Sequence, residues 1–154
     1  MEKLGNIGRR KIFYTAVRKN KNWAKSLPNR DWVAFTITNK EDEELVPKPE
    51  IKCLDDNVSY ICCSGTSPKT AEFYFDEEIS WRAIDYEMNT KKEFDYDYSP
   101  VTTAHKNFDE GFWFAACVAN DDLYDIDKVV CIDFTKRKVK KHLVELITKI
   151  NNGW

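Results

Sequence analysis

The sequence contains few of the residues that interrupt a chain and few that commonly catalyse reactions. Glycine and proline number five each in 154 residues, and histidine only two. So little glycine and proline excludes collagen-like and linker-like chains, and a hydrophobic content of 42% argues against global disorder. A chain of this length can bury one substantial core. We therefore expect a single folded domain over residues 1–154.

Long apolar runs and metal-binding cysteine spacings are also absent. No 18 consecutive residues are apolar, and residues 1–12 are basic without the apolar centre of a secretion signal. The five cysteines are an odd number and include no C-x-x-C pair, and most fall in apolar segments. We expect a cytoplasmic protein with free thiols, no membrane association and no metal or other cofactor.

Charge is distributed unevenly, although the net charge is only −2. Residues 1–30 carry nine Lys or Arg against one Glu, and residues 134–154 carry six against one. Residues 31–133 carry 24 Asp or Glu against nine Lys or Arg. An asymmetry of this kind bears on the choice of partner and on association. It does not select a fold.

Short segments rich in aromatic and β-branched residues dominate the pattern and indicate strands. We interpret as strands residues 11–17, 32–38, 50–54, 58–64, 71–75, 79–88, 112–119 and 128–134. Residues 94–98 alternate rings with carboxylates, which is typical of a half-buried strand or an ordered loop. Short polar turns join most of these segments. The predicted fold is α+β, with a mostly antiparallel, twisted sheet of about six to eight short strands.

The end of the chain shows the clearest helical periodicity. Apolar residues recur at spacings of three and four, and charged residues lie opposite them. The apolar positions are Val139, Leu143, Leu146, Ile147 and Ile150. We expect an amphipathic C-terminal helix that packs on one face of the sheet.

Catalytic residue patterns are weak. His142 falls on the flank of the terminal helix, where a solvated side chain is expected, and His105 lies in a polar loop segment. Neither histidine has an acid or a nucleophile at a recognised spacing. We therefore expect no enzymatic activity.

Two acidic patterns are compatible with metal binding. Residues 121–127 hold four aspartates but lack the central glycine of a calcium loop, so we interpret them as a solvated turn. Glu50-Ile51-Lys52, with Asp31 or Asp42 upstream, is similar to the acid and E-x-K pattern of magnesium-dependent nucleases. Such triplets arise by chance in a chain with 32% charged residues. A small metal-dependent hydrolase or nuclease stays an alternative.

The acidic middle of the chain also carries many aromatic rings, and this combination favours protein binding. Carboxylates steer a basic partner by electrostatics, and rigid rings anchor it. Small inhibitors of basic enzymes, such as immunity proteins that neutralise toxin nucleases, use this combination. The candidate partner-binding residues are Trp81, Asp85, Asp95, Tyr96, Asp97 and Tyr98. We expect a non-enzymatic, inhibitor-type protein with a basic protein partner.

Two other interpretations of the charge pattern remain open. The basic N-terminal segment, with Phe13, Tyr14 and Trp23, is a possible nucleic-acid surface, but the isoelectric point of about 5.8 argues against nucleic acid as the partner. Alternatively, the basic ends pack beside the acidic middle and neutralise it, and no partner is then implied. The sequence leaves the oligomeric state open.

Overall fold

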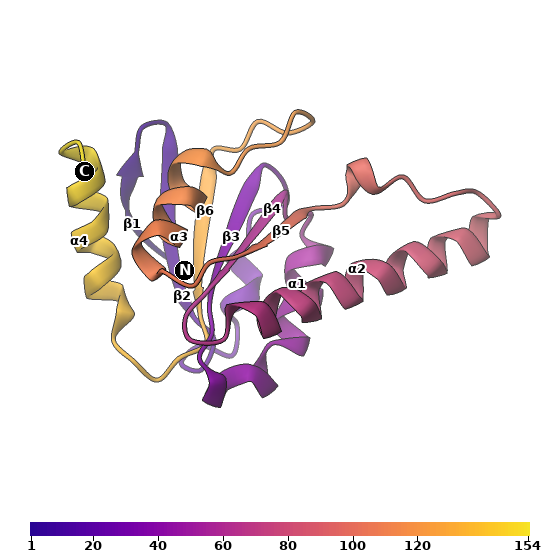
Figure 1. Cartoon of the computed structure of the whole chain (residues 1–154), viewed down its shortest axis with the longest axis horizontal. Helices are drawn as coiled ribbons and strands as arrows, with labels where there is room; N and C mark the ends of the chain where they lie inside the picture. Colours follow the sequence, from indigo (N-terminus) through magenta and orange to yellow (C-terminus); the bar gives the residue numbers. More distant parts are fainter.

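The structure, a computed structural model, describes all residues from 1 to 154 and is built on one six-stranded sheet (Figure 1). The strand order is β1-β2-β6-β3-β4-β5. Only β1 and β2 pair antiparallel, with an irregularity between Lys3 and Gly5, and the other four pairings are parallel. The strands are β1 Glu2–Ile7, β2 Arg10–Ala16, β3 Trp32–Ile37, β4 Tyr60–Ser64, β5 Val101–Ala104 and β6 Lys128–Asp133.

Helical crossovers link the parallel strands, because a parallel pair cannot be closed by a tight turn. The helices are α1 Pro47–Asp55, α2 Pro68–Thr90, α3 Phe108–Trp113 and α4 Val139–Asn151. A π-helical turn, Phe114–Val118, continues α3, and short 3₁₀ turns occur at Trp23–Ser26, Lys40–Leu45 and Tyr96–Tyr98. None of the helices has the length and apolar composition that spanning a membrane requires.

The prediction of a mostly antiparallel sheet is wrong, because several segments interpreted as strands are helices. Residues 50–54 belong to α1, residues 71–75 and 79–88 belong to α2, and residues 112–119 lie largely in α3 and its π-helical turn. Prolines 47 and 68 stand at the first helical position, where proline is well tolerated. With helices in place of these strands, the connections are long enough for parallel pairing.

The strongest apolar segments do form strands. Those predicted at 11–17, 32–38, 58–64 and 128–134 correspond to β2, β3, β4 and β6 within two residues. The amphipathic C-terminal helix is confirmed as α4. Residues 94–98 form an exposed segment with a 3₁₀ turn.

Both faces of the sheet are covered, as expected for buried parallel strands. Alternate residues of β3 therefore enter two cores. Val33, Phe35 and Ile37 face the core that we call the α4-side core, which α3, its π-helical turn and α4 cover. Trp32 and Ala34 face the α2-side core, which α1 and α2 cover. Every residue of β3 is buried, which explains why its sequence is apolar apart from Thr36.

Arg10 is the one buried arginine, and its side-chain hydrogen bonds go to backbone oxygens only. Its guanidinium donates to the carbonyl oxygen of Ala115 at 2.8 Å and also to that of Ala119. These carbonyls lie within and just after the π-helical turn, where the regular i to i−4 hydrogen-bond pattern is broken. Arg10 thus fastens β2 to the segment that covers the α4-side core.

We expect Arg10→Met to lower the free energy of unfolding by about 2–4 kcal/mol, because it removes two charge-assisted hydrogen bonds and leaves buried carbonyls unpaired. Urea denaturation followed by circular dichroism measures the change. Arg9→Met is the matched control. Arg9 is exposed and pairs only with Asp125, so its loss should cost less than about 1 kcal/mol. Equal losses in the two variants would contradict the role assigned to Arg10.

Glu50 is a buried carboxylate between α1 and α2. Its side chain is 6% exposed, and its Oε2 atom has no hydrogen-bond partner. Burial, with the neighbouring charges of Glu78 and Glu77 on α2, raises the pKa of Glu50 from 4.5 to about 8. The folded protein therefore holds a proton at neutral pH that the unfolded chain releases.

We expect this proton to make stability depend on pH. Between pH 4.5 and about 8 the folded state binds more protons at Glu50 than the unfolded state, so the contribution of Glu50 to stability falls as pH rises. Glu50→Gln should match the parent near pH 4 and be more stable at pH 8 by on the order of 1–3 kcal/mol. Thermal melts across this range test it, with the exposed Glu44→Gln as the control. A constant difference between Glu50→Gln and the parent at every pH would overturn the assignment.

Candidate functional site

Helix α2 and the chain that returns from it form a projection from the body of the protein (Figure 1). We call residues 68–100 the arm. One side of α2 is buried through Ala71, Phe75, Ile79 and Ala83. The C-terminal part of α2 runs out past the sheet, and the chain returns beside it to enter β5.

A second side of α2 is apolar and exposed. Phe73, Trp81, Ile84 and Met88 lie within one sector of the helix and are 60%, 57%, 43% and 65% exposed. We call these four residues the apolar stripe. A shallow pocket of about 380 Å³ runs along part of the apolar stripe, with Asp76 and Glu77 at its side. Large apolar side chains gathered on one exposed helix side are typical of a docking surface.

The arm is acidic. Residues 68–100 hold nine Asp or Glu and four Lys or Arg. The ion pairs of the arm all involve Arg82, which bonds to Glu78 at 2.9 Å and to Asp55 of α1 at 2.8 Å. The remaining carboxylates of the arm have no ion pair, so the arm presents negative charge around its apolar residues.

The structure divides the six predicted binding residues between two surfaces of the arm. Trp81 and Asp85 are exposed on α2, whereas the other four lie in the returning segment. That segment packs on α2 through Phe94, whose ring centroid is 5.6 Å from that of Tyr86 and 5.0 Å from that of Tyr96. Tyr86 lies about 140° from Trp81 around the helix axis. The two groups therefore do not form one face.

The returning segment nevertheless has a fixed shape and exposed rings. Asp95 Oδ1 accepts a hydrogen bond from the backbone N–H of Asp97 at 2.9 Å, which closes a small turn. Tyr96 and Tyr98 are 59% and 66% exposed. This second surface is acidic and aromatic, as the sequence indicates, but it lacks the aliphatic residues of the apolar stripe.

The two histidines are held by contacts within the protein. His142 Nε2 lies 2.6 Å from Asp109 Oδ1 on the exposed flank of α4, as predicted for a surface residue. His105 Nε2 lies 2.9 Å from Thr103 Oγ1, and its ring packs against Phe114. Burial lowers the pKa of His105, so the imidazole is neutral at pH 7.

The acids of the nuclease-like pattern are separated. Asp42 is buried and bonds to Arg18, whereas Glu50 faces the carboxylates of α2. Asp31 lies beside Arg30. In the whole chain no three His, Cys, Asp or Glu side chains are grouped so that they could hold a metal ion. The Asp121–Asp127 segment forms a turn, in which Asp121 Oδ1 accepts from the N–H of Leu123.

Several of the basic N-terminal residues contact the protein itself. Arg9 pairs with Asp125, and Arg10 is buried. Arg18 donates to the backbone oxygen of Phe134 at 2.9 Å and to Asp42 at 2.7 Å. The ion pairs neutralise part of the charge of the basic N-terminal segment and of the acidic middle of the chain. All of these contacts leave fewer cations for a nucleic-acid surface.

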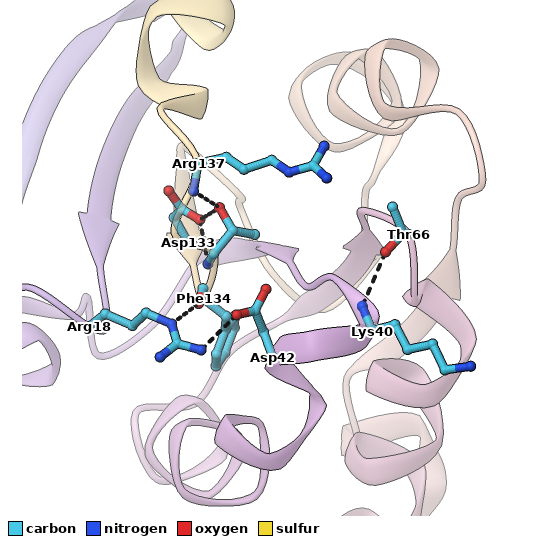
Figure 2. Close-up of polar contacts among 8 residues, drawn as sticks. Arg18, Lys40, Asp42, Thr66, Asp133, Phe134 and Arg137 are labelled. Atoms are coloured by element: carbon cyan, nitrogen blue, oxygen red, sulfur yellow. Dashed lines mark hydrogen bonds and ion pairs between the residues drawn. The ribbon is translucent and has the colours of Figure 1, made fainter.

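A polar network that the sequence analysis did not identify lies where the parallel strands end (Figure 2). The buried Asp133, last residue of β6, accepts from the N–H and the hydroxyl of Thr135, both at 2.8 Å. Its other oxygen accepts from Tyr14 at 2.6 Å. Beyond β3, Asn39 Oδ1 accepts from the N–H of Thr66 at 3.1 Å. In the sequence, the one signal for this site is the turn from Ser64 to Pro68, which joins a strand to a helix. Such a turn indicates a binding site only when the strands are known to be parallel, because sites then form at the carboxyl ends of the strands.

The chain matches a protein-family model over most of its length. Residues 10–150 match the model of a family described as a domain of unknown function, DUF7684. No curated protein and no solved structure is significantly similar to the chain. The match spans β2 to α4, and so includes the arm and the ends of all the parallel strands. The chain belongs to the DUF7684 family.

Proposed function

We propose that the protein is a binding domain that uses the arm to dock a basic protein, as an inhibitor of the immunity type does. The observation that carries the proposal is the apolar stripe on a helix that projects from the body. A helix of a single domain normally has one apolar side, which faces the core. Helix α2 has two, and the second faces solvent.

The surroundings of the apolar stripe support a partner of positive charge. Asp76 and Glu77 line the pocket along the stripe, and Asp85 follows Trp81 by four residues on the same helix. None of these three carboxylates has an ion pair. Flanking carboxylates accelerate encounter with a basic surface and discourage association with acidic ones. The large side chains then supply the desolvated contact that determines affinity. The partner expected from this chemistry is a basic protein with an apolar ridge, such as a toxin nuclease.

The cysteines support a reducing compartment, and we propose the cytoplasm. All five thiols are free, and four of them are buried. Burial raises the pKa values of Cys53, Cys62, Cys63 and Cys131, which keeps these thiols protonated and unreactive.

Site-specific photocrosslinking tests the proposal in cells that naturally make the protein. We expect a crosslinker at Ile84 to capture one discrete basic protein, whereas a crosslinker at Val144 of α4, which is similarly exposed, should not. The captured protein is then purified. We expect Trp81→Ala to weaken its binding about tenfold or more, because a buried aromatic anchor carries upward of about 1.4 kcal/mol at an interface.

The charge contribution is measured in the same assay. Asp85→Lys should slow association most at low salt, and the difference from the parent should shrink as salt rises. Glu44→Lys, a charge reversal in the Lys40–Leu45 turn outside the arm, is the control. A purified partner that binds the parent, Trp81→Ala and Asp85→Lys with the same affinity would refute docking at the apolar stripe.

A further inference from the structure

At the carboxyl ends of the neighbouring strands β3 and β6, the chain leaves toward opposite faces of the sheet. From the end of β3 the chain proceeds to α1, which covers the α2-side core. From the end of β6 it proceeds to α4, which covers the α4-side core. Open α/β sheets bind ligands in the crevice that such a divergence leaves at the carboxyl ends of the strands.

A cleft of about 280 Å³ occupies this position. Its walls come from the segments that follow four different strands. The residues that matter for binding are Asn39 after β3, Thr66 after β4, Lys106 and Phe108 after β5, and Thr135 and Arg137 after β6. We call it the carboxyl-edge cleft.

The floor of the carboxyl-edge cleft is held rigidly. Gly65 has φ +102°, and a Cβ atom there would lie 2.2 Å from the backbone oxygen of Thr38, so the turns after β3 and β4 are in tight contact. Thr66 Oγ1 accepts from the N–H of Lys40 at 3.1 Å (Figure 2). Thr135 Oγ1 accepts from the N–H of Arg137 at 3.2 Å while it donates to Asp133.

One amide donor at the carboxyl-edge cleft has no acceptor in the protein. Asn39 is only 5% exposed, and its Oδ1 atom is used by Thr66. Its Nδ2 group donates to no protein atom, although the residue lines the cleft. Both hydrogens of this amide nitrogen therefore remain available to a molecule in the cleft. The hydroxyl proton of Thr66 is likewise not used within the protein.

The charge of the carboxyl-edge cleft is positive. Lys106 and Arg137 line it without any ion pair, and no carboxylate is among the lining residues. In Figure 2 the Arg137 side chain extends away from Asp133, and its guanidinium contacts none of the other residues drawn. Asp133 is not among the lining residues; it is buried, and its oxygens accept three hydrogen bonds from Tyr14 and Thr135.

We propose that the carboxyl-edge cleft binds a phosphate group, either free or as a small phosphate monoester. Arg137 and Lys106 supply the charge, and the guanidinium fork suits phosphate oxygens. Asn39 Nδ2 and the Thr66 hydroxyl supply neutral donors. The volume of the cleft leaves room for a small organic group beside the phosphate, and that group would contact the ring of Phe108. This site is separate from the arm and does not depend on the function proposed for the arm.

In the experiment, isothermal calorimetry measures the titration of the purified protein with inorganic phosphate and with glycerol 3-phosphate, and thermal melts are recorded at several concentrations of each compound. We expect saturable binding and a melting temperature that rises with ligand concentration. Arg137→Ala and Lys106→Ala should each weaken binding at least about tenfold, the loss expected for one charge-assisted contact. Asn39→Asp keeps the acceptor for Thr66 but turns the free donor into an oxygen, and it should abolish binding.

Lys91→Ala, which removes an exposed charge from the arm, is the control and should bind like the parent. Tighter binding of glycerol 3-phosphate than of phosphate identifies a monoester ligand, and equal binding identifies free phosphate. The proposal is overturned if neither compound shows saturable binding at ligand concentrations up to about 10 mM, a rough upper limit for a specific small ligand. An equal loss of affinity in Lys91→Ala and Arg137→Ala also overturns it, because binding would then reflect only general charge.

Discussion

Strand β6 forms backbone hydrogen bonds along both of its edges, to β2 on one side and β3 on the other, although most of the chain lies between β3 and β6. All other connections follow from this placement. The chain progresses outward from β3 to β4 and β5 on one face, and it must then cross the opposite face to insert β6 beside β3. The crossing supplies α3 and the π-helical turn, and the exit from β6 supplies α4. The two cores, the buried Arg10 and the carboxyl-edge cleft are all consequences of this late central strand.

Local physical chemistry explains which parts of this arrangement could be predicted. β3 and β6 are apolar on both faces because both faces are buried, and α4 is amphipathic because one side of it is solvated. Helix α2 is different. Its buried and exposed sides are both apolar, so its sequence lacks a single stripe, and its many aromatic residues have high strand propensity. The direction of strand pairing is not a local property either, since it depends on whether the connections are helices or turns.

The two candidate sites differ in how far sequence could find them. Exposed rings and carboxylates on the arm are contiguous in the chain, so composition alone pointed to Trp81 and to Asp95–Tyr98, although not to the separation between them. Phe73, Ile84 and Met88 were missed, because an apolar residue is normally assigned to a core. The carboxyl-edge cleft joins Asn39, Thr66, Lys106 and Arg137 from four distant segments, and no spacing in the sequence connects them. Only the strand order brings them together.

The ends of the sheet limit how copies of this chain can associate. β1 is interrupted by the irregularity between Lys3 and Gly5, and it carries Glu2 and Lys3, while β5 at the other end is only four residues long. Short, charged or irregular edge strands are poor templates for further strand pairing. Growth of the sheet from one molecule into the next, the route to fibrillar aggregates, is therefore disfavoured at both ends. Exposed apolar side chains on the arm can then serve recognition without the backbone of an open edge adding indiscriminate affinity.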